Sequence, residues 1–321
     1  MHFKHTLLSA AAAAGSFQVA SAQRLTDTSI CDYYTAAVLK NNTAENQLTL
    51  LTVLVNTVVI GNYTKPNVGV VVPGILAAGE FNGKAVNLVP YFTGEFLSTN
   101  QGGTSGTSVN FLDGGGAEPI KKNMPANDTT SNQYFLLTHL YQFFGALLRC
   151  SEYGMGGAFS SYGGDASMYQ VHKFMDLGPE EVGYFVQQVA LAAASFGVAK
   201  DDITAVGVAL NSLFGIRCAP PTTVIPTQGP HLQSICVAED CPLSPNSTCG
   251  KYESVFPPMS ATSTSAMTSA MATSTNASAT TEIMATSTME SKPTSTAVTA
   301  GAAATGFSLL PVAWACVALL F

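Results

Sequence analysis

The chain has 321 residues, of which 47% are hydrophobic and only 10% are charged. Typical soluble domains carry about 25% charged residues, so groups other than charges must keep this surface polar. The formal net charge of −7 argues against a nucleic-acid partner, because binding to phosphates needs clustered Lys and Arg.

The N-terminus has the order of a secretory signal peptide. Lys4 gives a basic start, an apolar run extends from Leu7 to Ala14, and Ala20-Ser21-Ala22 has the small residues of a cleavage site. We expect residues 1–22 to be removed, which leaves Gln23 as the first residue of the mature chain. A buried N-terminal helix is the alternative.

Residues 43–60 predict a helix with a broad apolar face, and Asn41-Asn42-Thr43 supplies candidate caps. Its many β-branched residues leave a strand as the alternative. Residues 61–131 are irregular and rich in Gly, Pro and Asn, with a candidate strand at Val68–Val72. The Gly-rich stretches predict turns or loops and not a phosphate site, because no Lys-Ser/Thr pair follows them.

Periodic patterns return after this segment and predict four helices joined by short corners, at residues 132–148, 165–174, 179–196 and 201–214. Pro179 stands at a helix start with acidic residues in the first turn, and Asp201 or Asp202 is expected to cap the last helix. The predicted fold class is therefore mainly α, with one helical domain at residues 23–217 that carries a long irregular insertion at about 61–131.

Cysteine usage indicates an oxidising compartment. Cys316 lies in the apolar tail, and six cysteines remain for three disulfides, with fifteen possible pairings: Cys31, Cys150, Cys218, Cys236, Cys241 and Cys249. The last four lie in a Pro-rich segment, residues 218–255, that we expect to be pinned by disulfides. Zinc binding is the alternative, but paired CxxC spacing is missing.

About half of residues 260–300 are Ser or Thr, so we expect residues 256–300 to form a disordered, O-glycosylated stalk. Five Asn-x-Ser/Thr sequons fit the same compartment, at Asn41, Asn62, Asn127, Asn246 and Asn276. Sugar would supply the surface polarity that charge does not.

The C-terminal 15 residues, Phe307–Phe321, are almost wholly apolar and too short for the ~20 residues of a membrane span. Small residues precede them, which is typical of the signal for a GPI anchor. We expect attachment between Ser295 and Ala302, with Gly301 as the chosen site and residues 301–321 as the signal. A short membrane tail is the alternative.

Few residues of the mature chain are suited to catalysis. His139, His172 and His231 are the histidines, and neither a Gly-x-Ser-x-Gly elbow nor a His-Glu-x-x-His pair occurs. Charged residues are too sparse to nominate paired carboxylates. These features favour a binding or structural protein over an enzyme.

The segment from His139 to Phe214 resembles the C-terminal half of the truncated haemoglobins. The resemblance lies in Phe143-Phe144, Leu147-Leu148, Tyr162-Gly163-Gly164, Met168 and Val171-His172, followed by two long helices. It implies haem as cofactor, with His172 as the proximal iron ligand. Met168 and Val171 would pack near the ring, Phe143 and Phe144 would line the cavity, and Leu136 and Leu140 would lie on the ligand side with His139 as the polar candidate.

The sequence leaves two functions open. The first is a GPI-anchored surface protein whose globin-like domain binds haem, or a small ligand through haem. The second is a structural or adhesive surface protein whose globin-like helices have lost haem. The layout resembles fungal GPI proteins and predicts the outer face of the plasma membrane or the cell wall, with the membrane and wall polysaccharide as partners.

Overall fold

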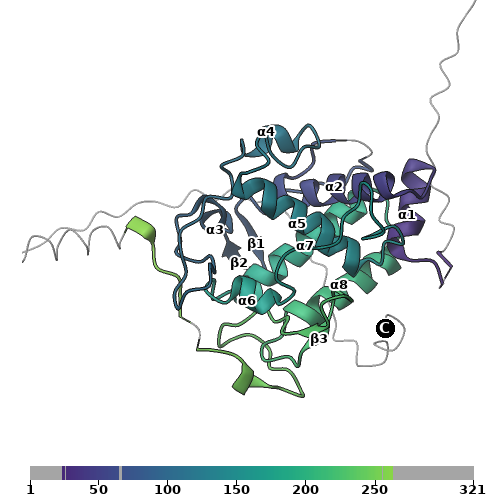
Figure 1. Ribbon diagram of the computed structural model, residues 1–321. Coiled ribbons are helices and arrows are strands. Elements are labelled where there is room, and N and C mark those ends of the chain that lie inside the picture. Colours follow the sequence, from purple (N-terminus) through teal and green to yellow (C-terminus); the bar gives the residue numbers. More distant parts are fainter. Residues whose placement is uncertain (1–23, 26, 65–66, 255, 263–321) are drawn as a thin grey trace, which may run out of the picture. The chain divides into compact units, whose positions relative to one another are not determined.

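The computed structural model describes residues 24–25, 27–64, 67–254 and 256–262 (Figure 1). This part of the chain is mostly α-helical, which confirms the predicted class. Its long helices are α1 (Ile30–Leu39), α2 (Ala44–Ile60), α5 (Asn132–Leu147), α7 (Pro179–Ser195) and α8 (Lys200–Phe214). Helix α2 packs against α1, α5 and α7, and α7 packs against α8. Helices α2 and α7 therefore form the centre of the domain.

Helix α2 is the helix expected at residues 43–60, and the alternative of a strand is wrong. The Thr43 side chain accepts a hydrogen bond from the N–H of Asn46 at 3.3 Å, as a cap does. Gly61, with a φ of +82°, ends the helix and donates its N–H to the carbonyl of Thr57. Burial against three helices outweighs the low helix propensity of the β-branched residues.

The next expected helices are also present, as α5, α6 (Met168–His172) and α7. Helix α6 is shorter than expected because Ser167 caps it, with its side chain accepting from the N–H of Gln170. Pro179 is the first residue of α7, and the Glu181 carboxylate accepts from the N–H of Gly178 at 3.1 Å.

Helix α8 starts differently from the prediction. Ala199 is its N-cap, with no side-chain cap, so the expected capping by Asp201 or Asp202 is wrong. The Asp202 carboxylate instead accepts hydrogen bonds from Arg24 at 2.9 Å and from the Tyr34 hydroxyl at 2.8 Å. The Asp202 side chain therefore makes a tertiary contact between α8 and the N-terminal part of the domain.

Residues 61–131 are largely irregular but contain four short elements: the antiparallel hairpin β1 (Gly79–Phe81) and β2 (Lys84–Val86), helix α3 (Val89–Thr93) and helix α4 (Ala117–Ile120). The strand expected at Val68–Val72 is not formed. The N–H of Val68 bonds to the carbonyl of Ser195 and not to a neighbouring strand, and Val68 and Val71 are exposed. Apolar residues without a partner strand do not make a sheet.

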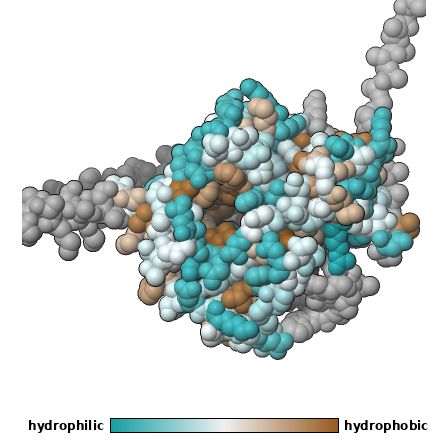
Figure 2. All heavy atoms as spheres, in the orientation of Figure 1, coloured by the Kyte–Doolittle hydropathy of each residue, from teal (hydrophilic) through white to brown (hydrophobic). Residues whose placement is uncertain are grey.

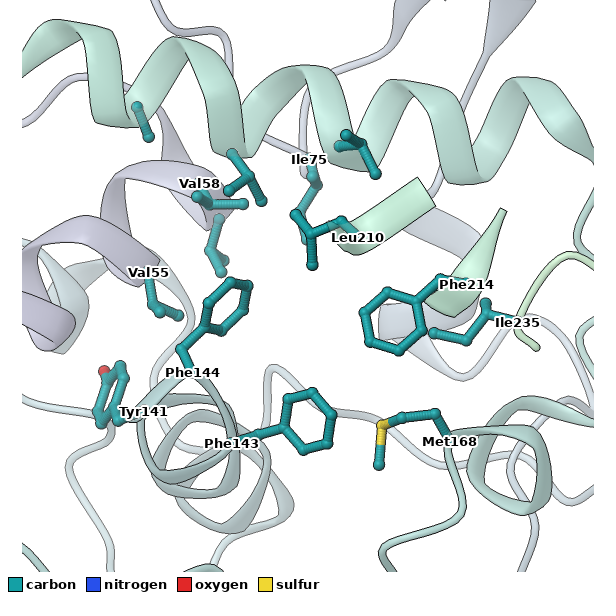
Figure 3. Close-up of a cluster of buried hydrophobic side chains, with 14 of the residues drawn as sticks. Val55, Val58, Ile75, Tyr141, Phe143, Phe144, Met168, Leu210, Phe214 and Ile235 are labelled. Atoms are coloured by element: carbon teal, nitrogen blue, oxygen red, sulfur yellow. The ribbon is translucent and has the colours of Figure 1, made fainter. Parts of the chain in front are cut away.

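The core lies where α2, α5, α7 and α8 meet. Figure 3 shows Val55 and Val58 of α2 near Phe144 of α5, and Leu210 and Phe214 of α8 beside them. Because large apolar side chains from four helices are withdrawn from water here, this cluster supplies most of the hydrophobic stabilisation of the domain.

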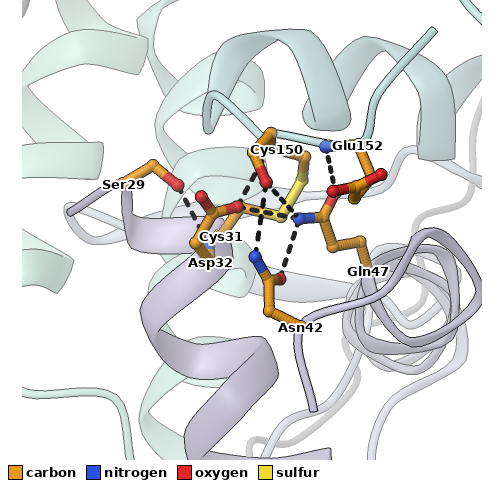
Figure 4. Close-up of a disulfide and its surroundings, with 8 residues drawn as sticks. Ser29, Cys31, Asp32, Asn42, Gln47, Cys150 and Glu152 are labelled. Atoms are coloured by element: carbon orange, nitrogen blue, oxygen red, sulfur yellow. Dashed lines mark hydrogen bonds between the residues drawn. A yellow bond between two sulfur atoms is a disulfide. The ribbon is translucent and has the colours of Figure 1, made fainter. Parts of the chain in front are cut away.

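Three disulfides are present, as expected for the six cysteines: Cys31–Cys150, Cys218–Cys249 and Cys236–Cys241. The first joins α1 to the end of α5, beside the buried Gln47, whose side chain bonds to Asp32 and to the N–H of Glu152 (Figure 4). The other two hold the C-terminal segment, which contains β3 (Thr222–Thr223), β4 (Pro230–His231) and the 3-10 helix Cys249–Lys251. Zinc binding by these four cysteines is wrong, because all four sulfurs are paired.

Several predicted features lie outside the described residues: the signal peptide, the stalk beyond residue 262, Asn276, and the anchor signal with Gly301. Within the described ranges, no helix has the length and apolar character that a membrane span requires.

Candidate ligand-binding cavity

A cavity of about 450 Å³ lies between α3, α5, α6 and α7 and opens to the surface. Figure 2 shows a recess with hydrophobic walls on this face of the molecule. All eight residues that the resemblance nominated for haem line it: Leu136, His139, Leu140, Phe143, Phe144, Met168, Val171 and His172. The fold thus brings one helix face of α5 and four of the five residues of α6, all but Tyr169, to the same space.

Helix α5 forms one wall because its lining residues recur every three or four positions, which places them on one face. Its start is fixed by Ser131, whose side chain accepts from the N–H of Tyr134, and by Asp113, which accepts from the N–H groups of Asn132 and Gln133. Along this wall Phe135 is 51% exposed, whereas Phe143 is 5% exposed. The helix therefore runs from the opening to the floor.

Helix α6 forms the opposite wall and is held by the C-terminal segment. The Ser167 hydroxyl donates to the carbonyl of Leu232 at 2.9 Å, and the N–H of Tyr169 donates to the same carbonyl. The Tyr169 hydroxyl accepts from the N–H of Glu253 at 2.7 Å. Met168 and His172 face the cavity as a result.

His172 is the polar group of this wall that is best suited to bind a ligand. Its Nδ1 lies 2.8 Å from the carbonyl oxygen of Met168. A carbonyl only accepts, so Nδ1 carries the proton and Nε2 keeps its lone pair. Nε2 has no hydrogen-bond partner among the described residues. Burial lowers the pKa of His172, which keeps the ring neutral at neutral pH.

His139 lies on the α5 wall among aromatic rings. Its ring centroid is 5.4 Å from that of Tyr162 and 6.5 Å from that of Phe135. Burial lowers the pKa of His139 as well. The Tyr162 hydroxyl donates to the carbonyl of Asp165 and its ring packs edge-on against Phe143. Tyr162 thus joins the α5 wall to Asp165, which lies just before α6.

The floor is apolar. The ring centroids of Phe143 and Phe214 are 6.1 Å apart, and Phe143 points toward Met168 (Figure 3). Ile75 and Ile235 complete this end of the cavity. No ordered polar group of the floor would compensate a buried charge, so only apolar ligand atoms are stable there.

Sequence reasoning missed the third wall. Leu88, Tyr91, Phe92 and Phe111 line the cavity from within residues 61–131, which carry no periodic pattern. The Tyr91 hydroxyl donates to the carbonyl of Met175 at 3.2 Å, and burial raises its pKa to about 12. The local concentration of aromatic residues at 91–96 was the available signal.

Within the described residues, no cluster of three or more His, Cys, Asp or Glu side chains is arranged to hold a bare metal ion. His139 and His172 are the histidines that line the cavity. Comparisons with family models, curated proteins and solved structures found no match.

Proposed function

We propose that this protein binds haem in the cavity, with His172 as the axial ligand. The proposal depends on one observation: a neutral imidazole presents an unpartnered Nε2 in a large apolar cavity. Histidines that ligate metals typically donate their other N–H to a carbonyl or carboxylate, and Nδ1 of His172 has such a partner in Met168.

The size and position of the cavity support the proposal. Its volume of about 450 Å³ falls within the ~300–1,000 Å³ of typical cofactor sites. Helices α7 and α8 follow α6 directly, in the order that the resemblance to truncated haemoglobins implies. Haem held there would supply an iron centre for small-ligand or redox chemistry.

The walls set two conditions on the bound group. Leu136 and Leu140 make the side facing α6 apolar, with His139 as its polar group, so a ligand on this side would meet few hydrogen-bond donors. Asp165 and Glu181 also line the cavity, so haem would have to bind with its anionic propionates away from these two carboxylates.

The purified protein, titrated with haemin, tests the proposal. We expect a Soret band typical of histidine-ligated haem, and its loss or shift in His172→Ala. His231→Ala is the matched control, because His231 lies outside the cavity and bonds to the carbonyl of Gln228. Absence of the band, or an unchanged spectrum in His172→Ala, would contradict ligation by His172. Binding to cells or glycans without haem would then favour the structural or adhesive role.

We further propose that the domain is displayed outside the cell by a GPI anchor, on the plasma membrane or the cell wall. Three disulfides and four exposed sequons, at Asn41, Asn62, Asn127 and Asn246, support this placement. Release of the protein from intact cells by a phosphatidylinositol-specific phospholipase tests it. Retention after treatment would point to a wall linkage or a membrane tail.

A further inference from the structure

The charges around the cavity are unbalanced. Asp165 and Glu181 line it, and neither Lys nor Arg does so in the described part of the chain. The cavity therefore presents negative charge to any ligand that enters.

Both carboxylates are fixed at helix starts beside the cavity. Asp165 Oδ1 accepts from the N–H of Ser167 at 2.8 Å, just before α6. Glu181 Oε2 accepts from the N–H of Gly178 at 3.1 Å, at the start of α7. These hydrogen bonds hold both carboxylates beside the cavity, so an anionic group that enters it is repelled by two negative charges.

The remaining surface of the cavity is suited to an apolar ligand that ends in a hydrogen-bond donor. Its floor is made by Phe143, Met168 and Phe214, and its opening carries the exposed Phe135 and Val171. On the α6 wall, Nε2 of His172 is an acceptor, since Nδ1 donates to Met168. A hydroxyl group can donate to Nε2, whereas an ionised carboxylate or sulfate has no proton to donate.

We propose that the cavity binds an uncharged, largely apolar small molecule with one hydroxyl group, the chemistry of a sterol or a long-chain alcohol, and discriminates against its anionic counterpart. The inference uses the same cavity as the proposed haem site but requires no iron. The hydroxyl donates to His172 Nε2, and the apolar body lies on the aromatic floor. Asp165 and Glu181 supply the discrimination by charge.

Binding of two matched pairs of probes to the haem-free protein tests this at neutral pH: cholesterol against cholesterol sulfate, and hexadecanol against palmitate, each by displacement of a fluorescent sterol or a fluorescent fatty alcohol. We expect at least one alcohol to bind and its anionic partner to bind about tenfold more weakly, or worse. The pair that binds identifies the ligand skeleton.

The double variant Asp165→Asn/Glu181→Gln should reduce the difference in affinity between each alcohol and its anionic partner, because it removes both negative charges. Both amides keep an oxygen that accepts the same N–H groups, so the local structure should be retained. Glu180→Gln is the matched control: the Glu180 carboxylate binds Lys84 and lies outside the cavity lining, so the difference should persist. Leu140→Trp should fill the cavity and abolish alcohol binding, with an unchanged circular dichroism spectrum as the check on folding.

The inference is overturned if neither alcohol binds, if the anionic partner binds equally well, or if Leu140→Trp binds the alcohol normally. If the protein binds haem but neither alcohol, only this inference is overturned. If it binds an alcohol but shows no Soret band of histidine-ligated haem, only the proposed haem function is overturned. His172→Ala should abolish haem ligation but weaken alcohol binding only by the loss of one hydrogen bond, about fivefold to tenfold.

Discussion

His172 donates its Nδ1–H to the carbonyl oxygen of Met168, one turn earlier in the same short helix, over a distance of 2.8 Å. This bond fixes the tautomer of the ring: the proton lies on Nδ1, and Nε2 keeps its lone pair. Burial acts in addition, because it lowers the pKa of both His172 and His139 below the ordinary value of 6.5. The two walls of the cavity thus each carry a neutral imidazole.

These lowered pKa values predict a loss of stability in mild acid. The unfolded chain takes up protons at about pH 6.5, before the folded chain does, so acid favours unfolding. The free energy of unfolding should be constant above this pH and fall as the pH drops toward the folded pKa values. Denaturant titrations across this window measure it. His139→Gln should reduce the pH dependence, and an identical dependence in this variant would contradict the role of His139.

Two helical glycines should respond oppositely to alanine. A Cβ on Gly183 of α7 would lie 2.2 Å from the ring of Phe81, so Gly183→Ala should destabilise the domain by about 1–3 kcal/mol. A Cβ on Gly207 of α8 meets no atom within 4 Å, so Gly207→Ala should stabilise it by up to about 1 kcal/mol. Thermal unfolding of the two variants measures both effects. An unchanged or raised stability of Gly183→Ala would contradict the packing of the hairpin on α7.

The disulfides should differ in their contribution to stability according to the length of chain they close. Replacing both Cys31 and Cys150 with Ala, across a separation of 119 residues, should cost about 5 kcal/mol. The same change at Cys236 and Cys241, separated by 5 residues, should cost about 2 kcal/mol. Chemical denaturation under non-reducing conditions gives both values. Equal losses would indicate that local strain, and not loop closure, sets the cost.

Two neighbouring aspartates should differ because only one is buried. Asp202 binds Arg24 and Tyr34, and Asp202→Asn should destabilise the domain by about 2–3 kcal/mol, since it removes the charge that pairs with Arg24. Asp201 is exposed, and Asp201→Asn should change the stability by less than about 0.5 kcal/mol. A large effect at Asp201, measured by denaturant unfolding, would contradict this assignment.

Sequence periodicity was sufficient for α2, α5, α7 and α8, because their apolar faces contact other helices. The pattern at residues 43–60 and the cap at Thr43 predicted α2, and the three-to-four-residue spacing on α5 placed the nominated residues on one face. Helix α1 was missed, although Ser29 before it and Asp32 in its first turn form a start signal. Its ten residues are stabilised by α2 and by the disulfide to Cys150, which local patterns do not reveal.

Two features could not be predicted from the local sequence, because they depend on residues far away in the chain. The valines at 68–72 have strand propensity, but the backbone of Val68 pairs with Ser195 and not with a strand. The wall formed by Tyr91 and Phe92 is held by the bond of the Tyr91 hydroxyl to the carbonyl of Met175, so its place at the cavity exists only in the folded domain. The sequence therefore predicted the walls formed by α5 and α6. The wall formed by Tyr91 and Phe92 depends on tertiary packing and could not be predicted from local patterns.

The attachment of α6 to the C-terminal segment has a mechanical consequence. Beyond Glu253, which bonds to Tyr169, the N–H of Ala261 donates to the carbonyl of Glu95, and Leu97 pairs with Met259. Tension applied to the chain at residue 262 is therefore borne first by these few hydrogen bonds and next by the wall of the cavity. The α2–α7 centre is loaded only afterwards, so stretching the chain would distort the cavity before it unfolds the domain.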